Sequence, residues 1–373
     1  MGGAAFDKYR IIAYKDTIMA STHLVNQVRT FREKRGWSQA DLARMAGLSR
    51  PEVSAIETGR LVPSAAAALS LARVFNCSVE GLFQLVEKSE TGRPDWAWAP
   101  TESPARVWVA HLGGRTVMYP VEGGELGCVP HDGVWDGHNV DLDPWAAPSR
   151  TLVIATCDPA VGLLAAELAS AENVRLIALQ RSSHAALQLL AGGLVHGAGL
   201  HLADAHQKAG NLGAATRAVK SGFHLIRVAE WEEGVTTRRG ASFRNVGQLV
   251  RGVRRWVGRD IGSGARQCQD MILAGHAAPR HTAYNHRSVA DAVRSGWAEA
   301  GICVRLVSAQ AGLEFLSIRR EPYDMCFSAD FAADSRYAAL LRVLHSTRFR
   351  RLLSALPGYT TGQTGEVSGS QAK

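Results

Sequence analysis

No stretch of this chain approaches eighteen uninterrupted apolar residues, so no membrane-spanning helix is expected. The six cysteines are scattered without a C-x-x-C pair, which argues against a disulfide framework and suits a reduced, cytoplasmic protein. The first twenty residues carry charges and lack an apolar core. No signal peptide is therefore predicted, and Met19 is a second candidate start.

The chain also shows no nucleophile–base–orienter set, no metal-ligand motif and no phosphate-binding loop. We therefore expect neither an enzyme nor a bound metal or cofactor. What is present is length and positive charge. The 373 residues predict two or three domains, and the net charge of +8 is unevenly distributed. Residues 91–204 carry 6 basic and 12 acidic side chains, and residues 205–300 carry 15 and 7.

Residues 25–85 contain several short helices, and two of them begin with recognisable caps. Ser38 is followed three residues later by Asp41, and Ser49 three residues later by Glu52. Such serine and acid pairs satisfy the unbonded N–H groups at a helix start. A break around Gly47 separates the two helices. This arrangement is typical of a helix-turn-helix, which reads DNA with its second helix.

The same residues closely resemble the XRE family of Cro/cI-type helix-turn-helix regulators. The resemblance includes Trp37-Ser38-Gln39, Ala46-Gly47-Leu48-Ser49, Ile56-Glu57 and Gly59-Arg60. It implies binding to double-stranded operator DNA, as a homodimer on a palindrome. By resemblance, the residues that face DNA are Gln39, Ser49, Arg50, Pro51, Ser54, Ala55, Thr58 and Arg60.

The helical region is followed by a linker rich in proline, serine and threonine. After the linker come two apolar segments separated by Gly113-Gly114, and this pattern predicts a β-hairpin. Residues 122–150 look like loop. From Thr151 onward, short apolar runs alternate with amphipathic helices, which predicts a parallel sheet with crossover helices. The final residues, 360–373, are predicted to be disordered.

Small polar residues follow three of the predicted strands, at the starts of helices. Cys157-Asp158, Ser182-Ser183 and Ser263-Gly264 offer free N–H groups and hydroxyls, which favour an anion. Arg266 lies one turn further on and can supply charge and a bidentate grip. Asp158 opposes a bare anion, and instead it caps its helix or accepts from a ligand hydroxyl.

Residues 151–359 resemble a periplasmic-binding-protein-like domain, often labelled molybdate-binding-like, that occurs behind XRE modules in bacterial regulators. The resemblance rests on the segments around Cys157-Asp158-Pro159, His196 to Asp204, Arg259 to Arg266, His286 to Gly296, and Glu321 to Asp324. It implies two α/β lobes of the type II kind with a ligand cleft between them. The expected ligand residues are Cys157, Asp158, Ser182, Ser183, His201, Ser263, Gly264, Arg266 and Tyr323.

The chain is thus predicted to contain an all-α DNA-binding domain (20–86), a linker with a hairpin (87–150), a two-lobed α/β domain (151–359) and a tail. The leading hypothesis is a one-component transcriptional regulator that senses a small anion such as molybdate, tungstate or an organic anion. One alternative is a repressor whose second domain serves only oligomerisation. Another is an enzyme linked to molybdenum-cofactor metabolism.

Overall fold

The computed structural model describes residues 22–87, 95–123, 128–202, 210–241 and 243–370. The chain divides into two compact units, residues 1–93 and 94–373, and each is described by itself. The second unit therefore begins inside the segment that the sequence assigned to a linker. Among the described residues, no helix is both long and apolar enough to cross a membrane.

The first unit is a helical bundle closed by a short antiparallel strand pair. Its apolar core includes Val28, Leu42, Ile56, Leu71 and Phe75. The strand pair joins the two ends of the unit and was not predicted. The elements are β1 (Thr22–Asn26), α2 (Val28–Lys34), α3 (Gln39–Ala46), α4 (Arg50–Glu57), α5 (Ala65–Phe75), α6 (Val79–Leu82) and β2 (Phe83–Glu87).

Both predicted capping boxes are confirmed. The Ser38 hydroxyl accepts from the N–H of Asp41 at 3.1 Å, and the Ser49 hydroxyl accepts from the N–H of Glu52 at 3.3 Å. Between the two helices, Gly47 has φ = 68°, a left-handed conformation that glycine adopts without strain. The predicted helix-turn-helix is therefore present.

The second unit begins with a small five-stranded sheet in the order β3-β5-β4-β6-β7. The predicted hairpin is confirmed: β4 and β5 pair across Gly113 and Gly114, which have φ of 57° and 79° and form a two-residue turn. The strands are β3 (Asp95–Trp96), β4 (Ala105–Leu112), β5 (Arg115–Pro120), β6 (Gly133–Trp135) and β7 (Val140–Leu142).

The prediction of loop for residues 122–150 is wrong in part, because β6 and β7 extend this sheet. Strands of three residues give no periodic signal in the sequence. Nor is this segment a free linker. Trp108 and Tyr119 pack in one core with Val153 and Leu190 of the larger fold, which fixes the small sheet against it.

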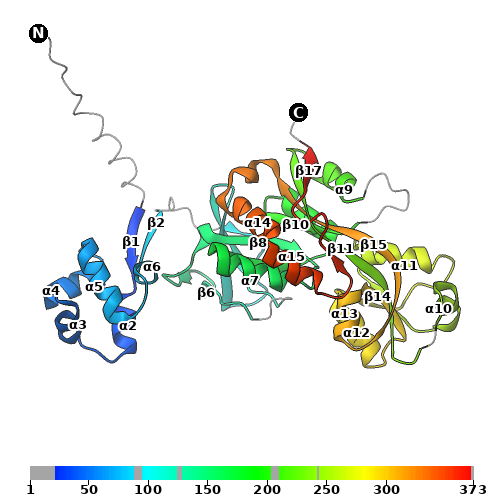
Figure 1. Cartoon of the computed structure of the whole chain (residues 1–373), viewed down its shortest axis with the longest axis horizontal. Coiled ribbons are helices and arrows are strands. Elements are labelled where there is room, and N and C mark those ends of the chain that lie inside the picture. Colours follow the sequence, from blue (N-terminus) through cyan, green and yellow to red (C-terminus); the bar gives the residue numbers. More distant parts are fainter. Residues whose placement is uncertain (1–21, 88–94, 124–127, 203–209, 242, 371–373) are drawn as a thin grey trace, which may run out of the picture. The chain divides into compact units, whose positions relative to one another are not determined.

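The larger fold is one mixed sheet of ten strands with helices packed around it (Figure 1). The predicted strand–helix alternation is confirmed from β8 onward. The strands are β8 (Thr151–Thr156), β9 (Arg175–Gln180), β10 (Gly197–Leu200), β11 (Phe223–Thr237), β12 (Trp256–Arg259), β13 (His281–Ala283), β14 (Ala300–Val304), β15 (Glu314–Ser328), β16 (Tyr359–Thr360) and β17 (Val367–Ser370). The helices are α7 (Val161–Glu172), α8 (Ser183–Ala191), α9 (Gly210–Ala218), α10 (Val246–Gly252), α11 (Gly264–Ile272), α12 (His286–Arg294), α13 (Arg305–Gln310), α14 (Ser335–His345) and α15 (Thr347–Ser354), with 3₁₀ turns at Pro148–Arg150 and Ala329–Ala333.

Two strands of 15 residues, β11 and β15, pair antiparallel along almost their whole length and connect two halves of the sheet. At one end, β15 pairs with β10, which leads to β8 and β9. We call this half lobe one. At the other end, β11 pairs with β14, which leads to β12 and β13. We call this half lobe two. The predicted two-lobed α/β architecture is therefore present.

The prediction of a disordered tail is wrong for residues 360–370. β17 pairs with the first residues of β11, and the buried Thr364 donates its hydroxyl hydrogen to the carbonyl of Val228 at 2.7 Å. The sequence of the tail is polar and rich in glycine, which is typical of disorder. Its order comes from backbone bonds to β11, and these depend on a partner strand more than 130 residues away. Residues 371–373 lie outside the described residues.

His196, in the loop before β10, is a buried histidine whose two nitrogens are both bonded. Its Nδ1 accepts from the N–H of Val153 at 2.9 Å, and its Nε2 lies 2.8 Å from the carbonyl of His111. Burial, together with the charge of Arg336, lowers the pKa of His196 to about 4. Because protonation would also remove the acceptor at Nδ1, the folded protein holds this ring neutral.

A histidine with a lowered pKa stabilises the fold above its unfolded pKa of 6.5, and that contribution is lost as the pH falls toward 4. We predict that the difference in free energy of unfolding between the wild type and His196→Gln, which does not titrate, narrows by about 2 kcal/mol from pH 7 to pH 5. Urea unfolding of both proteins at the two pH values measures it. A difference that stays constant with pH would contradict the assignment.

Candidate functional site

The helix-turn-helix presents a set of side chains at the start of α4 and along it. Arg50 and Pro51, the first two residues of α4, are exposed, whereas Ser54 and Ala55 are half-buried one turn later. An exposed arginine at the start of such a helix can reach either a base edge or a phosphate.

The residues after α4 are fixed by their own hydrogen bonds. Thr58 donates its hydroxyl hydrogen to the carbonyl of Ser54 at 2.8 Å, and Arg60 donates from Nε to the Thr58 hydroxyl at 3.0 Å. Both Thr58 and Arg60 are exposed. The guanidinium of Arg60 is therefore held beside the end of α4.

A buried carboxylate, Glu57, connects three helices of the first unit. Its side chain is 2% exposed and accepts from Arg32 of α2 at 2.6 and 3.1 Å, and from Nε2 of Gln39 of α3 at 2.9 Å. Gln39, a predicted DNA residue, is thus oriented from within the domain. The sequence analysis assigned no such role to Glu57, because its partners lie 18 and 25 residues away.

In the second unit, a group of buried polar side chains lies where the two lobes meet, and we call it the interlobe cluster. Ends of parallel strands gather at one edge of a sheet, which explains why residues distant in sequence meet here. The cluster consists of Cys157 after β8, His201 after β10, Trp231 and Glu233 in β11, Arg259 at the end of β12, His286 at the start of α12, and Arg319, Glu321 and Tyr323 in β15.

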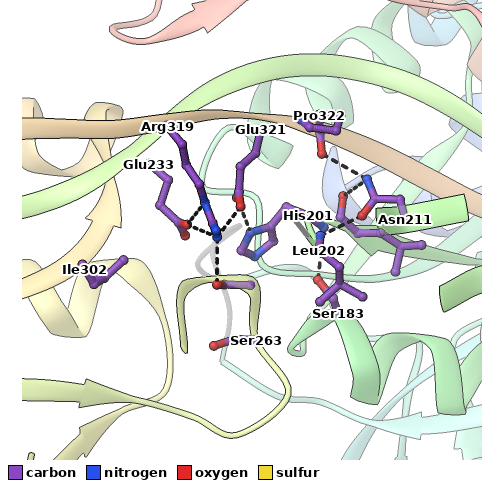
Figure 2. A network of polar contacts seen from close by, with 12 residues as sticks. Ser183, His201, Leu202, Asn211, Glu233, Ser263, Ile302, Arg319, Glu321 and Pro322 are labelled. Carbon is purple, nitrogen blue, oxygen red and sulfur yellow. Dashed lines mark hydrogen bonds and ion pairs between the residues drawn. The ribbon is translucent and has the colours of Figure 1, made fainter. Parts of the chain in front are cut away.

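Arg319 is at the centre of the charged part of this cluster (Figure 2). Its Nε and Nη2 donate to Glu233 at 3.1 and 2.7 Å, and it also forms an ion pair with Glu321. Glu321 in turn faces Nδ1 of His201 at 3.2 Å. Nη2 of Arg319 further donates to the carbonyl of Gly264 at 3.2 Å, so this guanidinium also holds the start of α11.

Three side chains of the cluster have strongly shifted pKa values. Burial alone would lower the pKa of His201, but Cys157 and Glu321 together raise it well above the ordinary value. Burial and the neighbouring charge of Arg259 lower the pKa of His286 well below its ordinary value. Burial and Glu321 raise the pKa of Glu233 to about 7. His286 is therefore neutral at physiological pH, and Glu233 titrates near neutrality.

Buried polar atoms without a hydrogen-bond partner are concentrated at this place. Among the described residues there are eight, and two of these, on Asp260 and Glu321, still have an arginine as an ion-pair neighbour. The others are Nε2 of Gln180, His201 and His286, Nε1 of Trp231, Nε of Arg259 and Oε1 of Glu233. Each such atom costs about 1–3 kcal/mol when left unbonded, so native proteins hold few of them. Their concentration between two lobes makes this cluster the candidate binding site.

Part of the cluster resembles a metal site. Cys157, His201 and His286 each have one potential metal-ligating atom, and these three atoms lie within 4.8 Å of one another. However, Arg259 can only donate, and its Nη1 lies 3.0 Å from Nδ1 of His286. The proton of the neutral His286 ring is thus assigned to Nε2, which offers a donor and no lone pair. With Arg319 also present, these residues suit an anion better than a cation.

Of the predicted ligand residues, four belong to the cluster or touch it: Cys157, His201, Tyr323 and Gly264. The Tyr323 ring stacks on Trp231 with centroids 4.6 Å apart, and its hydroxyl lies 2.5 Å from that of Thr156. Gly264 lies so close to His201 that a Cβ at position 264 would collide with the carbonyl oxygen of His201.

Three others line a neighbouring pocket of about 650 Å³ between α8 and α11. These are Ser182, Ser263 and Arg266. The Ser263 hydroxyl caps α11 and donates to the carbonyl of Asp260 at 2.9 Å. Arg266 donates to Asp270 at 2.8 Å and to the carbonyl of Arg259 at 3.2 Å. The guanidinium of Arg266 is therefore engaged within lobe two.

The last two are bonded within lobe one. Asp158 accepts from the N–H of Ala160 at 2.9 Å and from the hydroxyl of Tyr359 at 2.7 Å. The Ser183 hydroxyl oxygen accepts from the N–H of His201 at 3.2 Å. Both residues shape the loops around the cluster. The capping role that the sequence left open for Asp158 is not found, because α7 has no side-chain cap and Asp158 instead closes the turn before it.

Sequence reasoning missed six residues of the cluster. Arg259, His286 and Glu321 belong to segments that carry the family resemblance, but they were not taken as ligand residues. The others are Trp231, Glu233 and Arg319, in the two long strands. No local signal marks Glu233, since residues 223–237 also contain Arg227, Glu230 and Glu232, and it is the folded sheet that buries Glu233 completely.

Comparison with known proteins agrees with this architecture. The model of the helix-turn-helix family matches residues 28–82, and that of the PBP superfamily domain matches residues 165–345. A transcriptional regulator of the HTH type from Archaeoglobus fulgidus is 40% identical over 57 residues, which are 15% of this chain and 81% of that protein. YgzD of Bacillus subtilis, also an HTH-type regulator, is 38% identical over 64 residues, which are 17% of this chain and 97% of that protein.

A third relative, the competence pilus inhibition repressor of Acinetobacter baylyi, is 35% identical over 78 residues, which are 20% of this chain and 71% of that protein. The fold and its first unit thus define a DNA-binding regulator. The chain belongs to the family of HTH-type transcriptional regulators, and it carries a periplasmic-binding-protein-like domain behind the helix-turn-helix.

Two solved structures illustrate the similarity of the second unit. A phosphate-transporter substrate-binding protein with bound phosphate from Clostridium perfringens aligns with a TM-score of 0.45 and 10% identity, over 56% of this chain and 99% of that chain. A tungstate-transporter structure from Geobacter sulfurreducens aligns with a TM-score of 0.41 and 14% identity, over 55% of this chain and 97% of that chain. Similarity at this level says nothing about the ligand of this chain.

The close approach of Gly264 to His201 allows a test of the contact between the lobes. Gly264 has no positive φ and lies in the first turn of α11, so alanine fits its backbone. The added Cβ would meet the carbonyl and Nδ1 of His201, the latter at 2.6 Å. We predict that Gly264→Ala opens this contact, so that backbone amides of residues 197–202 exchange with deuterium about tenfold faster or more.

Gly247→Ala is a matched control, because it also lies in the first turn of a lobe-two helix but its Cβ would have no neighbour closer than 3.5 Å. Hydrogen–deuterium exchange of the full chain measures both variants. Equal protection of residues 197–202 in Gly264→Ala and the wild type would show that the two lobes do not rely on this close contact.

Proposed function

We propose that this protein is a one-component, ligand-responsive transcriptional regulator. Its first unit binds operator DNA as a homodimer, and its second unit closes on a small anionic ligand. The observation that carries the ligand-sensing role is the set of unbonded, buried donors in the interlobe cluster. Nε2 of His286, Nε1 of Trp231 and Nε of Arg259 all belong to it.

The proposed ligand contacts come from both lobes. His201 and Cys157 belong to lobe one, His286 and Arg259 belong to lobe two, and Trp231 lies in the connecting strand β11. A ligand bonded to both halves binds the closed arrangement more tightly than the open one. It therefore shifts the population toward the closed form, and this differential affinity is the free energy available to change DNA binding.

On the DNA side, we propose that α4 enters the major groove. Arg50 would contact a base edge, and Ala55 would contact a thymine methyl group. Gln39, which Glu57 holds, and the exposed Thr58 and Arg60 would contact phosphates and fix the orientation of the domain. Ser49, Pro51 and Ser54 complete this surface.

We expect Arg50→Ala to weaken binding by about 1–3 kcal/mol at a single base position, because a bidentate contact to guanine is lost. The measurement is fluorescence anisotropy against a selected operator and its single-base variants. Arg73→Ala is the control, since it removes an equal charge from the exposed face of α5. A loss of equal size across all operator variants would instead assign Arg50 to a phosphate.

The sensing role predicts that the full chain is stabilised by a small anion, and that the same anion changes its affinity for operator DNA. A ligand at 100 times its dissociation constant should add about 2.7 kcal/mol, visible as a rise in melting temperature. His286→Leu removes a proposed donor and should abolish most of this rise. His276→Leu changes an exposed histidine after α11 and should keep it.

The screen covers molybdate, tungstate, sulfate, phosphate and small organic anions, with operator binding measured in parallel. If no anion stabilises the protein and none changes DNA binding, the sensing role is wrong. The second unit would then serve oligomerisation, which sedimentation of the full chain would show.

A further inference from the structure

The interlobe cluster contains acceptors as well as donors. His201, Glu233 and Glu321 are all buried, and each has one potential ligand atom that lies within 4.8 Å of those of the other two. The two carboxylates come from opposite strands, β11 and β15. A ligand that bonds to His201 thus lies close to two carboxylates.

The two carboxylates differ in how many of their oxygens have a hydrogen-bond or ion-pair partner. Glu321 is occupied on both, since one oxygen faces Nδ1 of His201 and the other is paired with Arg319. Glu233 uses Oε2 to accept twice from Arg319, and its buried Oε1 has no N–H or O–H partner. Burial and Glu233, in part through a hydrogen bond between the two side chains, raise the pKa of Cys268, so it remains a thiol, which is only a weak donor to Glu233.

Two cations face the two carboxylates. Arg319 is shared between Glu233 and Glu321, and His201, whose pKa is raised well above its ordinary value, also faces Glu321. The charges are thus balanced within the cluster, and what an ionised Glu233 lacks is a strong donor to its Oε1. An incoming atom that carries a hydrogen would satisfy that oxygen, whereas an incoming lone pair would be repelled by it.

We infer that the anion sensed by this protein carries its own hydrogen-bond donor, an O–H or N–H group, and that Oε1 of Glu233 accepts from it. This inference rests on the proposed ligand-sensing function and specifies its ligand. The class includes hydrogen phosphate, aminophosphonates and amino acids, whose carboxylate is the anionic group and whose ammonium is the donor. Oxyanions without a proton, such as sulfate, molybdate and tungstate, are excluded from it.

The physical basis is that a ligand either donates a hydrogen bond to the buried acceptor or places a second lone pair against it. Hydrogen phosphate and sulfate are both tetrahedral and both dianionic, but only hydrogen phosphate has an O–H group. A site built to bond a donor on its ligand rejects the analogue without it by up to about 10⁴–10⁵-fold, because the buried acceptor is left unpaired and faces a negative oxygen. Size alone would not separate this pair.

The test is isothermal titration of the full chain at pH 8, where Glu233 is ionised. The probes with a donor are inorganic phosphate, aminomethylphosphonate and glycine, and the probes without one are sulfate, molybdate and tungstate. We expect at least one of the first group to bind about 100-fold or more tightly than every member of the second. Sulfate or molybdate binding as tightly as all three probes with a donor would overturn the inference and leave the sensing function intact.

A second measurement addresses Glu233 directly. Glu233→Gln keeps the shape of the side chain and offers an N–H in place of the carboxylate oxygen. The preference for the donor-carrying probe over sulfate should fall at least about tenfold. Glu232→Gln is the control, since the adjacent Glu232 binds Arg305 and Arg320 at 2.9 and 2.8 Å and has no unbonded oxygen among the described atoms.

The two experiments test the ligand class and the role of Glu233 separately. An unchanged preference in Glu233→Gln would overturn the role of Glu233. If that variant does not fold, the comparison of phosphate with sulfate in the wild type still decides the inference. Failure of all six probes to bind counts against the donor-carrying ligand, and failure of the wider anion screen counts against sensing itself.

Discussion

The guanidinium of Arg319 is the interaction on which the region between the lobes depends. It lies in one of the two strands that run through both lobes, and it faces Glu233 in the other strand, Glu321 in its own strand and the carbonyl that starts α11. Two buried carboxylates without this cation would carry a large desolvation penalty. Arg319 opposes the rise in the pKa of Glu233, and its second partner, Glu321, helps to raise the pKa of His201.

Features encoded by neighbouring residues were predictable from the sequence. The serine–acid caps of α3 and α4, the Gly-Gly turn of the β4–β5 hairpin and the buried strand β8 all depend on residues within a few positions of one another. The errors concern pairing partners. β17 is ordered by β11, and β6 by β4, so the sequence of either segment read alone resembles loop.

The binding site was only partly predictable for the same reason. Helix-start serines were taken as ligand contacts, yet the Ser183 hydroxyl bonds to the backbone of His201 and the Ser263 hydroxyl to that of Asp260. What no local pattern contains is the meeting of His286 with His201, whose rings lie 5.8 Å apart although the residues are 85 positions apart in sequence.

The two units use buried carboxylates in different ways, and the contrast bears on function. In the first unit, both oxygens of Glu57 are bonded, to Arg32 and to Gln39, as expected where a carboxylate serves to hold helices together. Glu233 has the same kind of arginine partner, but its Oε1 has no N–H or O–H partner, and unbonded donors on His286 and Trp231 belong to the same cluster. A purely structural carboxylate would gain stability from a full set of partners. The unbonded oxygen is therefore better explained by a ligand that supplies the missing hydrogen.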